Sequence, residues 1–335
     1  MPQEELRNVS IIGDGGMGTV LAMLLCEKAV PTRMWGYDAG QLAEIECKRE
    51  NAKFLPGYRL PTALVFEPED DRAMAGADLI VSAVPCQYMR RVWSRLKVHV
   101  PSGVPIVSVA KGIENGTLLR PTQILADVLG DEVPRAVLSG PTIADELARR
   151  LPATACAAAE DPGLAVRIQK TFTCPWLRVY TNSDVVGVEL AGAMKNVIAI
   201  AAGIIDGVGA GDNAKAALLA RGLAEITRLG LAMGATEQTF AGLTGLGDLV
   251  TTCISPSGRN RSFGERIGRG RTPAEAQGAT DSVVEGIATC ESVAALASRH
   301  RVEMPIARAV YEVLFENKPV RSAIDDLMSR RLRAE

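Results

Sequence analysis

Short apolar runs alternate with longer polar and amphipathic segments through the first half of the chain. The runs are rich in β-branched residues and several end at glycine or proline, a pattern typical of buried parallel strands. Strands are predicted at residues 8–12, 31–35, 78–84, 105–110, 136–139, 153–159 and 177–180. Helices are predicted between them. This alternation predicts a doubly wound α/β domain over residues 1–183.

The second half of the chain is predicted to be almost wholly helical. Residues 184–205 are small or apolar on every side, and residues 213–229 are amphipathic at helical spacing. Residues 235–241 are expected to form a further short helix. A polar break at residues 181–184 supplies a helix start. We therefore expect an all-α domain over residues 184–335.

One lysine, Lys195, followed by Asn196, interrupts the apolar residues 184–205. A transmembrane helix needs ~20 consecutive apolar residues, so these two side chains and the nearby Asp206 and Asp212 argue against a membrane span. Burial disfavours the charged form of an ammonium group. Lys195 therefore has polar partners or faces a polar cavity, unless its stem carries the charge out to solvent. The sequence leaves these interpretations open.

Composition narrows the range of partners. The 335 residues are 47% hydrophobic and 4% aromatic, with a formal net charge of −2. Nucleic-acid binding uses basic surfaces and stacking rings, so we expect no nucleic-acid partner, and we expect no membrane insertion. The seven cysteines are an odd number without CxxC spacing, which favours reduced thiols. With only two histidines no metal is expected, and the absence of a recognisable secretory signal favours the cytoplasm.

The segment after the first predicted strand carries a nucleotide-binding pattern. Gly13, Gly15 and Gly18 form G-x-G-x-x-G between a strand and an apolar helix. The first glycine permits a tight turn, the second lets a pyrophosphate approach the backbone, and the third lets the helix pack on the strand. The N–H groups at the start of the helix then attract phosphate. The pattern predicts a dinucleotide-binding domain of the Rossmann type.

The end of the second strand bears on the choice of cofactor. Asp38 lies twenty residues after Gly18, where an acidic residue can hold the ribose 2′-hydroxyl of NAD. It is equally suited to cap the helix that begins near Gln41. Arg33 lies within the strand and is poorly placed for the 2′-phosphate of NADP. The choice between NAD and NADP stays open.

Later strand ends offer further candidates. Lys111 follows the strand at 105–110, and the turn at 140–142 follows the strand at 136–139. Ligands bind at the carboxyl ends of the strands in such sheets. We therefore consider Lys111 a ligand contact, with an ordinary exposed lysine as the alternative.

Two candidates lie in the helical half. Glycines flank Asp248 at residues 245–249, which predicts a turn that presents a carboxylate; a helix N-cap is the alternative. Residues 255–271 are rich in glycine and arginine, and we expect a loop there. Within it Arg259 and Asn260 suit bidentate capture of one phosphate or carboxylate. Most other arginines of this stretch are expected on a solvated helix face.

These segments together resemble the NAD(P)-dependent glycerol-3-phosphate dehydrogenases of the bacterial cytoplasmic type. The resemblance extends from Asn8 to about Asn317, and its most specific segments are GAMKNV and GLGDL. In order, it is carried by GDGGMGTVLA (13–22), MWGYD (34–38), NAKFLPG (51–57), AKGIE (110–114), SGPTIADELA (139–148), GAMKNVIAIAAGIIDG (192–207), GLGDLVTTC (245–253), GRNRSFG (258–264) and VVEG (283–286).

The resemblance implies a fold, a reaction and partners. The fold would be a Rossmann-type domain followed by an all-α domain of the 6-phosphogluconate dehydrogenase C-terminal type. The reaction would interconvert dihydroxyacetone phosphate and sn-glycerol 3-phosphate with NAD or NADP. Its product would supply glycerophospholipid synthesis, and the chain would form a homodimer.

The resemblance also implies a role for each matching residue. Lys195 would be the catalytic proton donor and acceptor. The implied substrate-binding residues are Lys111, Gly140, Thr142, Lys195, Asp248, Arg259 and Asn260. The implied cofactor-binding residues are Gly13, Gly15, Gly16, Met17, Gly18, Tyr37, Lys111, Ala144, Arg259, Val283 and Glu285.

Three places depart from the family pattern. Gly16 and Met17 stand where relatives usually have serine and an aromatic residue, so the contacts expected from that loop are those of its backbone N–H groups. Tyr37 stands where many relatives have arginine or histidine near the adenosine ribose, which weakens the case for NADP. Gly258 replaces a serine before Arg259, so that a hydroxyl contact to the substrate would be lost.

We hypothesise that Lys195, supported by Asp248 and Lys111, stabilises the oxyanion of the reacting ketone and protonates it. Arg259 and Asn260 would hold the substrate phosphate. A 6-phosphogluconate- or ketopantoate-type reductase is the nearest alternative, because such enzymes also place a lysine on the helix after a Rossmann domain. A dinucleotide-binding sensor without turnover is a second alternative.

Overall fold

The computed structural model describes residues 8–280 and 283–331 and divides into two compact units. The first unit takes in the chain up to Lys111 and then Arg120–Val185. The second takes in Gly112–Leu119 and the chain from Val186 onward. Residues 1–7, on which the expectation of no secretory signal depends, lie outside the described range.

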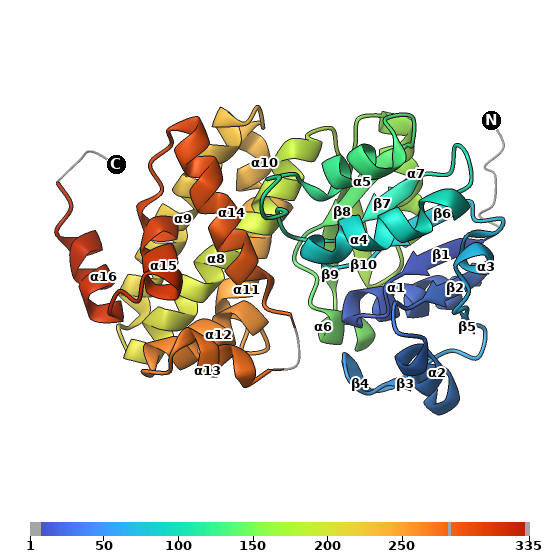
Figure 1. Ribbon diagram of the computed structural model, residues 1–335, viewed down its shortest axis with the longest axis horizontal. Helices are drawn as coiled ribbons and strands as arrows, with labels where there is room; N and C mark the ends of the chain where they lie inside the picture. The colour runs from blue at the N-terminus through green and yellow to red at the C-terminus, as the bar shows by residue number, and fades with distance from the viewer. Residues whose placement is uncertain (1–7, 281–282, 332–335) are drawn as a thin grey trace. The chain divides into compact units, whose positions relative to one another are not determined.

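A single twisted sheet organises the first unit (Figure 1). Its strand order is β10-β9-β8-β7-β6-β1-β2-β5, and all neighbours are parallel except the pair β8 and β9. The chain order reverses between β1 and β6, which is the switch point where doubly wound sheets bind ligands. The strands are β1 (Val9–Ile12), β2 (Thr32–Trp35), β5 (Val65–Phe66), β6 (Leu79–Ser82), β7 (Ile106–Ser108), β8 (Arg135–Ser139), β9 (Ala153–Ala159) and β10 (Leu177–Asn182).

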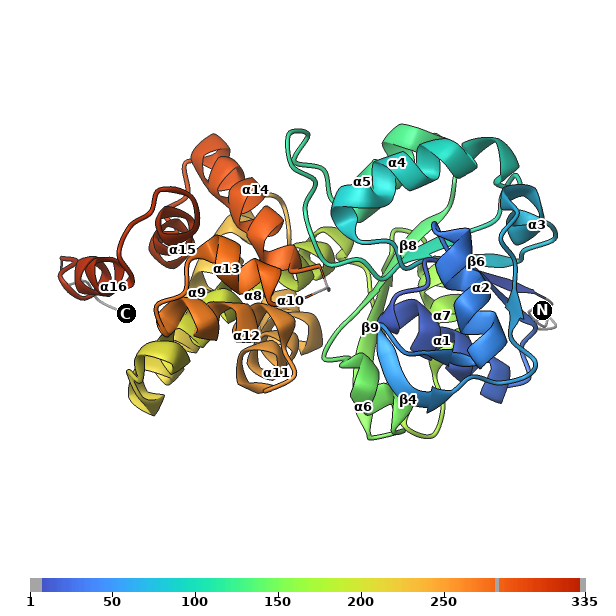
Figure 2. The same cartoon turned by 60° about the horizontal axis from the view of Figure 1, so that its bottom comes forward.

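Helices cover both faces of this sheet, with α4 and α5 on one side and α1 and α7 on the other (Figure 2). Strands buried on both faces have apolar residues at nearly every position, and every residue of β1, β6 and β7 is buried. The helices are α1 (Gly16–Glu27), α2 (Ala39–Lys48), α3 (Asp70–Met74), α4 (Cys86–Leu96), α5 (Pro121–Leu129), α6 (Ala144–Ala148) and α7 (Pro162–Phe172), with a 3₁₀ turn at Lys97–His99.

Every strand predicted from the apolar runs is present. The sequence pattern missed β5 and the antiparallel hairpin of β3 (Glu50–Asn51) and β4 (Leu55–Arg59). Strands of two residues are too short to show an alternating pattern, and β4 contains Pro56 and Gly57, which are depleted in strands. The Rossmann-type fold of this unit is confirmed.

The second unit is all-helical in its described part, as predicted. Its long helices are α8 (Val185–Val208) and α9 (Asp212–Ala232). The others are α10 (Glu237–Ala241), a π-helical turn at Leu243–Gly247, α11 (Asp248–Ile254), α12 (Arg259–Gly268), α13 (Pro273–Gly278), α14 (Glu285–His300), α15 (Pro305–Phe315) and α16 (Val320–Met328).

Helix α8 is the core of this unit. Among the described helices it alone is long and apolar enough to cross a membrane, but 94% of its most apolar window is buried inside the protein. Glycines let α12 approach it closely: a Cβ on Gly203 would lie 1.9 Å from the carbonyl oxygen of Arg261, and one on Gly264 would lie 2.0 Å from that of Ile200. The first turn of α12 is thereby held against α8.

The prediction of a loop over residues 255–271 was wrong, because α12 occupies Arg259–Gly268. Phe263 and Ile267 are spaced four residues apart, and both are buried, which gives this short segment an apolar face. The many glycines concealed that face in the sequence.

The segment Gly112–Leu119 packs with the second unit, although it lies between strands of the first in the sequence. Ile113 is completely buried there, and its carbonyl accepts a hydrogen bond from the Ser292 hydroxyl at 3.0 Å. The amide of Asn115 donates to Glu291 at 2.7 Å. The chain that follows Lys111 is therefore anchored in the helical unit.

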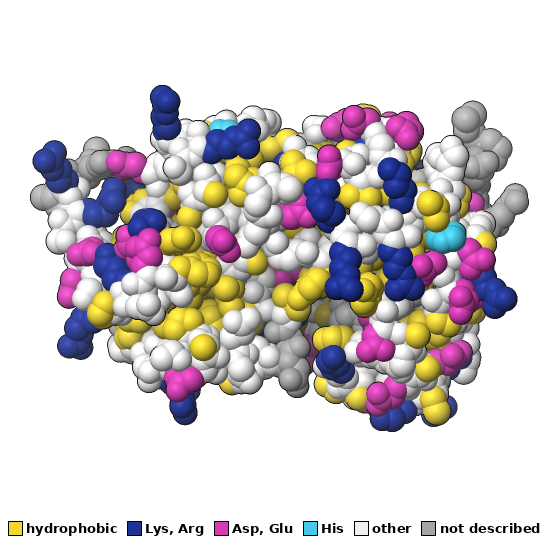
Figure 3. All heavy atoms as spheres, in the orientation of Figure 1, with side chains coloured by type: hydrophobic (Ala, Val, Ile, Leu, Met, Phe, Trp, Pro, Cys, Tyr) yellow, Lys and Arg dark blue, Asp and Glu magenta, His cyan; other side chains and the backbone are white. Residues whose placement is uncertain are grey.

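Side chains of both charges are interspersed on the face seen in Figure 3. The seven cysteines are all free thiols in the structure.

Candidate active site

The loop after β1 has the shape that a dinucleotide requires. Gly13 has φ +112°, and a Cβ on it would lie 2.7 Å from the Ala83 carbonyl oxygen. A Cβ on Gly18 would lie 2.1 Å from the carbonyl oxygen of Gly13. Apart from Gly15 itself and its two chain neighbours, no described atom lies within 4 Å of a Cβ built on Gly15, so that its backbone is open to a ligand. Helix α1 begins at the next residue without a side-chain cap. Its N–H groups are therefore suited to hold a pyrophosphate.

The lack of a side chain at Gly16, one of the three departures from the family pattern, has a local structural reason. A Cβ there would lie 2.8 Å from the Phe54 carbonyl oxygen, so the missing side chain lets the β3–β4 segment lie against the loop. The same Cβ would lie 3.6 Å from that of Ala144 at the start of α6. The structure thus brings Ala144 beside the glycine loop.

Asp38 caps α2. Its Oδ1 accepts hydrogen bonds from the backbone N–H groups of Gly40 at 2.9 Å and Gln41 at 3.2 Å, so the capping interpretation is confirmed. In the glycine loop, Asp14 accepts from the Gln41 side chain at 2.5 Å. Burial raises the pKa of the Asp14 carboxyl, the Gln41 hydrogen bond opposes this, and the charge of Asp38 adds to it. Two carboxylates therefore flank this end of β2.

Lys111 is engaged by the turn after β8. Its Nζ donates a hydrogen bond to the Gly140 carbonyl at 2.8 Å, and the Thr142 hydroxyl donates to the same oxygen at 3.1 Å. The three residues predicted as substrate contacts in this unit therefore lie together, and the interpretation of Lys111 as an ordinary exposed lysine was wrong.

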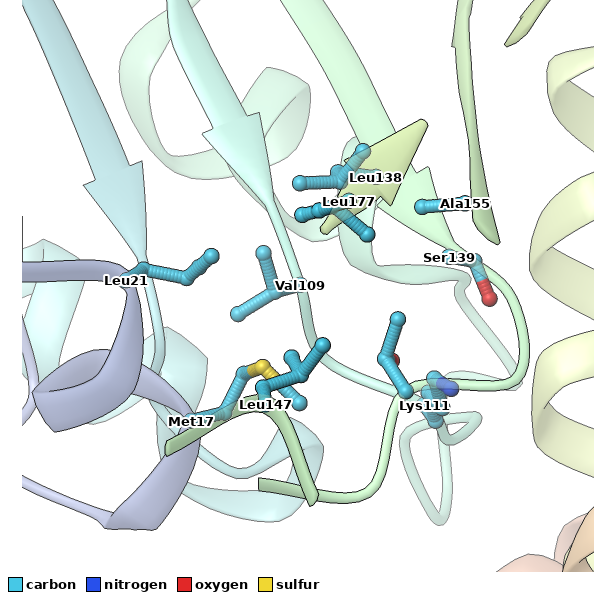
Figure 4. Close-up of a pocket in the computed structure, with 10 residues that line it drawn as sticks. Met17, Leu21, Val109, Lys111, Leu138, Ser139, Leu147, Ala155 and Leu177 are labelled. Carbon is cyan, nitrogen blue, oxygen red and sulfur yellow. The ribbon is translucent and has the colours of Figure 1, made fainter. Parts of the chain in front are cut away.

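A small, mostly apolar cavity of ≈ 20 Å³ lies between this turn and the glycine loop (Figure 4). It has room for about one water molecule. Ser139 lines it, is 3% exposed, and its hydroxyl has no hydrogen-bond partner among the described residues. The lining residues are Met17, Leu21, Val109, Lys111, Leu138, Ser139, Thr142, Leu147, Ala155 and Leu177.

The second unit holds Lys195 in a buried polar network. The residue is 6% exposed, and its Nζ donates hydrogen bonds to Asp248 Oδ1 and, at 2.6 Å, to Thr252 Oγ1. The interpretation with a solvent-exposed ammonium was therefore wrong. Asp248, 1% exposed, is the first residue of α11 and not its N-cap, which is Gly247. A buried carboxylate close to the ammonium offsets the cost of burying each charge.

The surroundings of this ion pair are buried. Cys253, completely buried, lies close enough to feel the charges of Lys195 and Asp248, and burial raises the pKa of its thiol to about 12. Because charges interact more strongly where water is excluded, the ammonium is well suited to stabilise a negative charge that develops beside it.

Asn260 links three helices around the network. Its Nδ2 donates to Asn196 Oδ1 on α8 at 2.9 Å, and its Oδ1 accepts from the backbone N–H of Gly286 in α14 at 2.9 Å. Asn196 is the neighbour of Lys195, and Gly286 follows Glu285. The start of α14, where Glu285 lies, is thereby fixed against α8, with Val283 39% exposed just before it.

Arg259 occupies the first turn of α12 and is exposed. It has no ion-pair partner in the described part of the chain. The N-cap, Gly258, contributes no side-chain hydrogen bond to the helix start. A guanidinium beside open N–H groups at a helix N-terminus is a favourable place for an anion.

Three polar residues escaped the reasoning from sequence. Thr252 follows Asp248 by one helical turn, a spacing that places both on one face of α11. Asn196 stands next to the catalytic candidate, but it had no assigned role. Ser139 carried no signal, because a serine at a strand end is common.

Comparison with known proteins assigns the family. The model described as NAD-dependent glycerol-3-phosphate dehydrogenase N-terminus matches residues 8–165, and that described as its C-terminus matches residues 184–325. The chain belongs to the NAD-dependent glycerol-3-phosphate dehydrogenase family.

Relatives of this family align with nearly the whole chain. Glycerol-3-phosphate dehydrogenase [NAD(P)+] of Geobacter sulfurreducens is 48% identical over 98% of both chains. The crystal structure of glycerol-3-phosphate dehydrogenase from Coxiella burnetii superimposes with a TM-score of 0.94 at 36% identity, covering 97% of this chain and 99% of that one. The resemblance found in the sequence motifs is thus confirmed, and with it an NAD(P)-dependent oxidoreductase.

The alternative reductase is similar in fold only. A ketopantoate reductase of the PanE/ApbA family from Ralstonia eutropha JMP134 aligns with a TM-score of 0.59 at 15% identity. The two proteins therefore share a fold, and the glycerol-3-phosphate dehydrogenase family is the one whose models match this chain.

Proposed function

We propose that this family member interconverts dihydroxyacetone phosphate and sn-glycerol 3-phosphate by hydride transfer with NAD(P)H, and that Lys195 is its catalytic acid and base. The observation that carries the assignment is the buried bonding of Lys195 to Asp248 and Thr252. A buried ammonium held in place by hydrogen bonds is the group that a ketone oxygen needs as it gains negative charge.

In this proposal the first domain, residues 1–183, binds the dinucleotide. The open backbone at Gly15 and the uncapped start of α1 fit a pyrophosphate, and neither needs a side chain at Gly16. Gly13, Met17, Gly18, Tyr37, Lys111 and Ala144 complete the proposed contacts in this domain. The nicotinamide supplies the hydride, and the chain must hold the ring, position the ketone and deliver the proton.

In this proposal the second domain, residues 184–335, supplies the group that stabilises and protonates the ketone oxygen. Asp248 and Thr252 fix Lys195 Nζ in one orientation, so that little rearrangement is needed when charge develops. In the reverse direction the amine accepts the proton of the substrate hydroxyl. Arg259, Val283 and Glu285 are proposed as further contacts to the dinucleotide.

The phosphate of the substrate is assigned to Arg259 and Asn260. Arg259 supplies a charge that has no internal ion-pair partner among the described residues, and the start of α12 adds backbone N–H donors. Asn260 already uses its oxygen on Gly286 and one amide N–H on Asn196, which preorganises its other N–H. Lys111, Gly140 and Thr142 are proposed to contact the same substrate from the first domain.

Initial rates of NADH and NADPH oxidation test this proposal. Dihydroxyacetone phosphate should support turnover, whereas dihydroxyacetone, which lacks the phosphate, should support little. Equal rates with both ketones would contradict the phosphate assignment, and oxidation of neither cofactor would contradict the reaction.

Three properties of the family extend the proposal. We propose that the chain works in the cytoplasm, forms a homodimer and supplies glycerol 3-phosphate for glycerophospholipid synthesis. Sedimentation equilibrium gives the oligomeric state, and a mass of one chain would contradict the dimer.

A further inference from the structure

Two arginines of α4 surround the tyrosine at the end of β2. Arg95 binds the Asp70 carboxylate with two hydrogen bonds, of 2.7 and 2.8 Å. The buried Trp35 donates its indole N–H to the same carboxylate at 3.0 Å. The Arg95 guanidinium also lies 5.2 Å from the centre of the Trp35 ring and 5.6 Å from that of Tyr37. Its charge is therefore neutralised and its position fixed.

Arg91 is different. It precedes Arg95 by one turn of α4, and its guanidinium lies 5.0 Å from the centre of the Tyr37 ring. It is exposed, and no carboxylate pairs with it in the described part of the chain. Stacking on an aromatic ring orients a guanidinium but leaves its N–H groups available. Arg91 is thus a positioned cation whose charge is not compensated.

The ring of Tyr37 marks the adenosine end of the dinucleotide site. Tyr37 lies two residues beyond β2, and a Cβ on the preceding Gly36 would lie 3.0 Å from the Asp14 carboxylate of the glycine loop. The turn after β2 is therefore in contact with that loop. In dinucleotide-binding sheets of this kind, the adenosine ribose lies at the end of the second strand, and a nearby arginine accommodates the 2′-phosphate of NADP.

Two carboxylates at this end of β2 disfavour the binding of a phosphate. The carboxylates of Asp14 and Asp38 both flank the turn, and Asp38 also occupies the start of α2 as its cap. Arg95 is already paired with Asp70. Lys53, whose Nζ donates to the Gln41 side chain at 3.2 Å, offsets part of this negative charge. Without Arg91 the two carboxylates would still outnumber Lys53 and would disfavour a dianion.

We infer that Arg91, stacked on Tyr37, binds the 2′-phosphate of NADP and thereby determines how well this enzyme uses NADPH. The inference depends on the proposed function for its kinetic test, but not for its binding test.

The kinetic test compares Arg91→Gln with Arg90→Gln. Arg90 is the neighbouring arginine of α4, and its guanidinium pairs with Asp127. With dihydroxyacetone phosphate saturating, Arg91→Gln should lower kcat/KM for NADPH by at least ~10-fold, because a charge-assisted bidentate contact is lost. The value for NADH should stay within about 2-fold, and Arg90→Gln should change neither.

The binding test titrates adenosine 2′,5′-bisphosphate and adenosine 5′-monophosphate into both variants by calorimetry. Arg91→Gln should weaken only the bisphosphate, again by at least ~10-fold. Unchanged bisphosphate affinity, an equal loss for both nucleotides, or a wild-type enzyme that uses NADH but not NADPH would overturn the inference. A wild-type enzyme that oxidises neither cofactor would instead contradict the proposed function, and the titration would still decide the role of Arg91.

Discussion

The two units are suited to their ligands by different means. In the first, the glycine loop offers backbone N–H groups from one continuous stretch, from Gly13 to Gly18. In the second, the polar network joins side chains of α8, α11 and α12, with Lys195 and Asp248 separated by 53 residues. A backbone site depends on local conformation, whereas a side-chain site depends on how helices pack. The two should therefore respond differently to substitution.

The side-chain network should give the largest effect on turnover. Lys195→Ala removes the proposed acid, and we expect at least a ~10²-fold loss of turnover, the usual contribution of a positioned acid or base. NADH binding, measured by fluorescence titration, should persist because the glycine loop is untouched. Lys215→Ala is a matched control, since Lys215 is also paired with a carboxylate, Asp206, at 2.8 Å. Near-normal turnover of the Lys195 variant would end the assignment.

The backbone site should separate binding from stability. Gly15→Ala has room for its methyl group in the protein alone, so its melting temperature should be close to wild type, while the methyl group should obstruct the pyrophosphate and weaken NADH binding by ~10-fold or more. Gly18→Ala places a methyl group 2.1 Å from the Gly13 carbonyl oxygen and should lower the free energy of unfolding by ~1–3 kcal/mol.

Calorimetry and thermal melts of these two variants measure both quantities. A Gly15→Ala protein that binds NADH normally would show that the open backbone is not the pyrophosphate site. A Gly18→Ala protein with wild-type stability would contradict the close contact of helix and strand.

At Arg259 a side-chain site and a backbone site coincide, because its guanidinium lies at the start of α12 beside the N–H groups of the helix N-terminus. Arg259→Ala should raise KM for dihydroxyacetone phosphate by ~10-fold or more, with a smaller change in kcat, since the phosphate is bound in the ground state too. Arg269→Ala is the control, because Arg269 lies at the other end of α12 and pairs with Glu265. An unchanged KM would rule out the phosphate contact.

Glu225 is a second buried carboxylate of the helical unit, and backbone N–H groups bind it, whereas Lys195 binds Asp248. Glu225, 3% exposed, accepts hydrogen bonds from the backbone N–H groups of Ile306 and Ala307 at 2.7 and 3.2 Å. Burial raises its pKa to about 7, against the lowering effects of these two bonds and of Arg228 and Arg330. In the unfolded chain the carboxyl would titrate near its ordinary value, 4.5.

The sign of the resulting pH dependence follows from proton binding. Between these two values the folded protein keeps a proton that the unfolded chain releases, so stability falls as the pH rises. This contribution is fully present below about pH 4.5 and lost through about pH 7, and it amounts to about 3 kcal/mol. Urea unfolding of wild type and Glu225→Gln across this range measures it. A slope that persists in the variant would assign the effect to other groups.

Much of the first unit was predictable because its determinants are local. The apolar runs predicted most of the strands, and the spacing of Gly13, Gly15 and Gly18 predicted the loop. The two-residue strands β3 and β5 were missed because strands so short show no alternating pattern. The helix α12 was missed because its glycines serve packing against α8 and not flexibility.

The sequence by itself determined the order of strands and helices, the glycine turn and the family motifs, since these depend on neighbours in the chain. It left open whether Lys195 was buried or solvent-exposed and whether Asp38 capped a helix. Tertiary packing decided those questions, and it brought Thr252 to Lys195 and Arg91 to Tyr37. Such contacts join residues far apart in sequence, and burial then fixes which charges are paired; no local pattern encodes either.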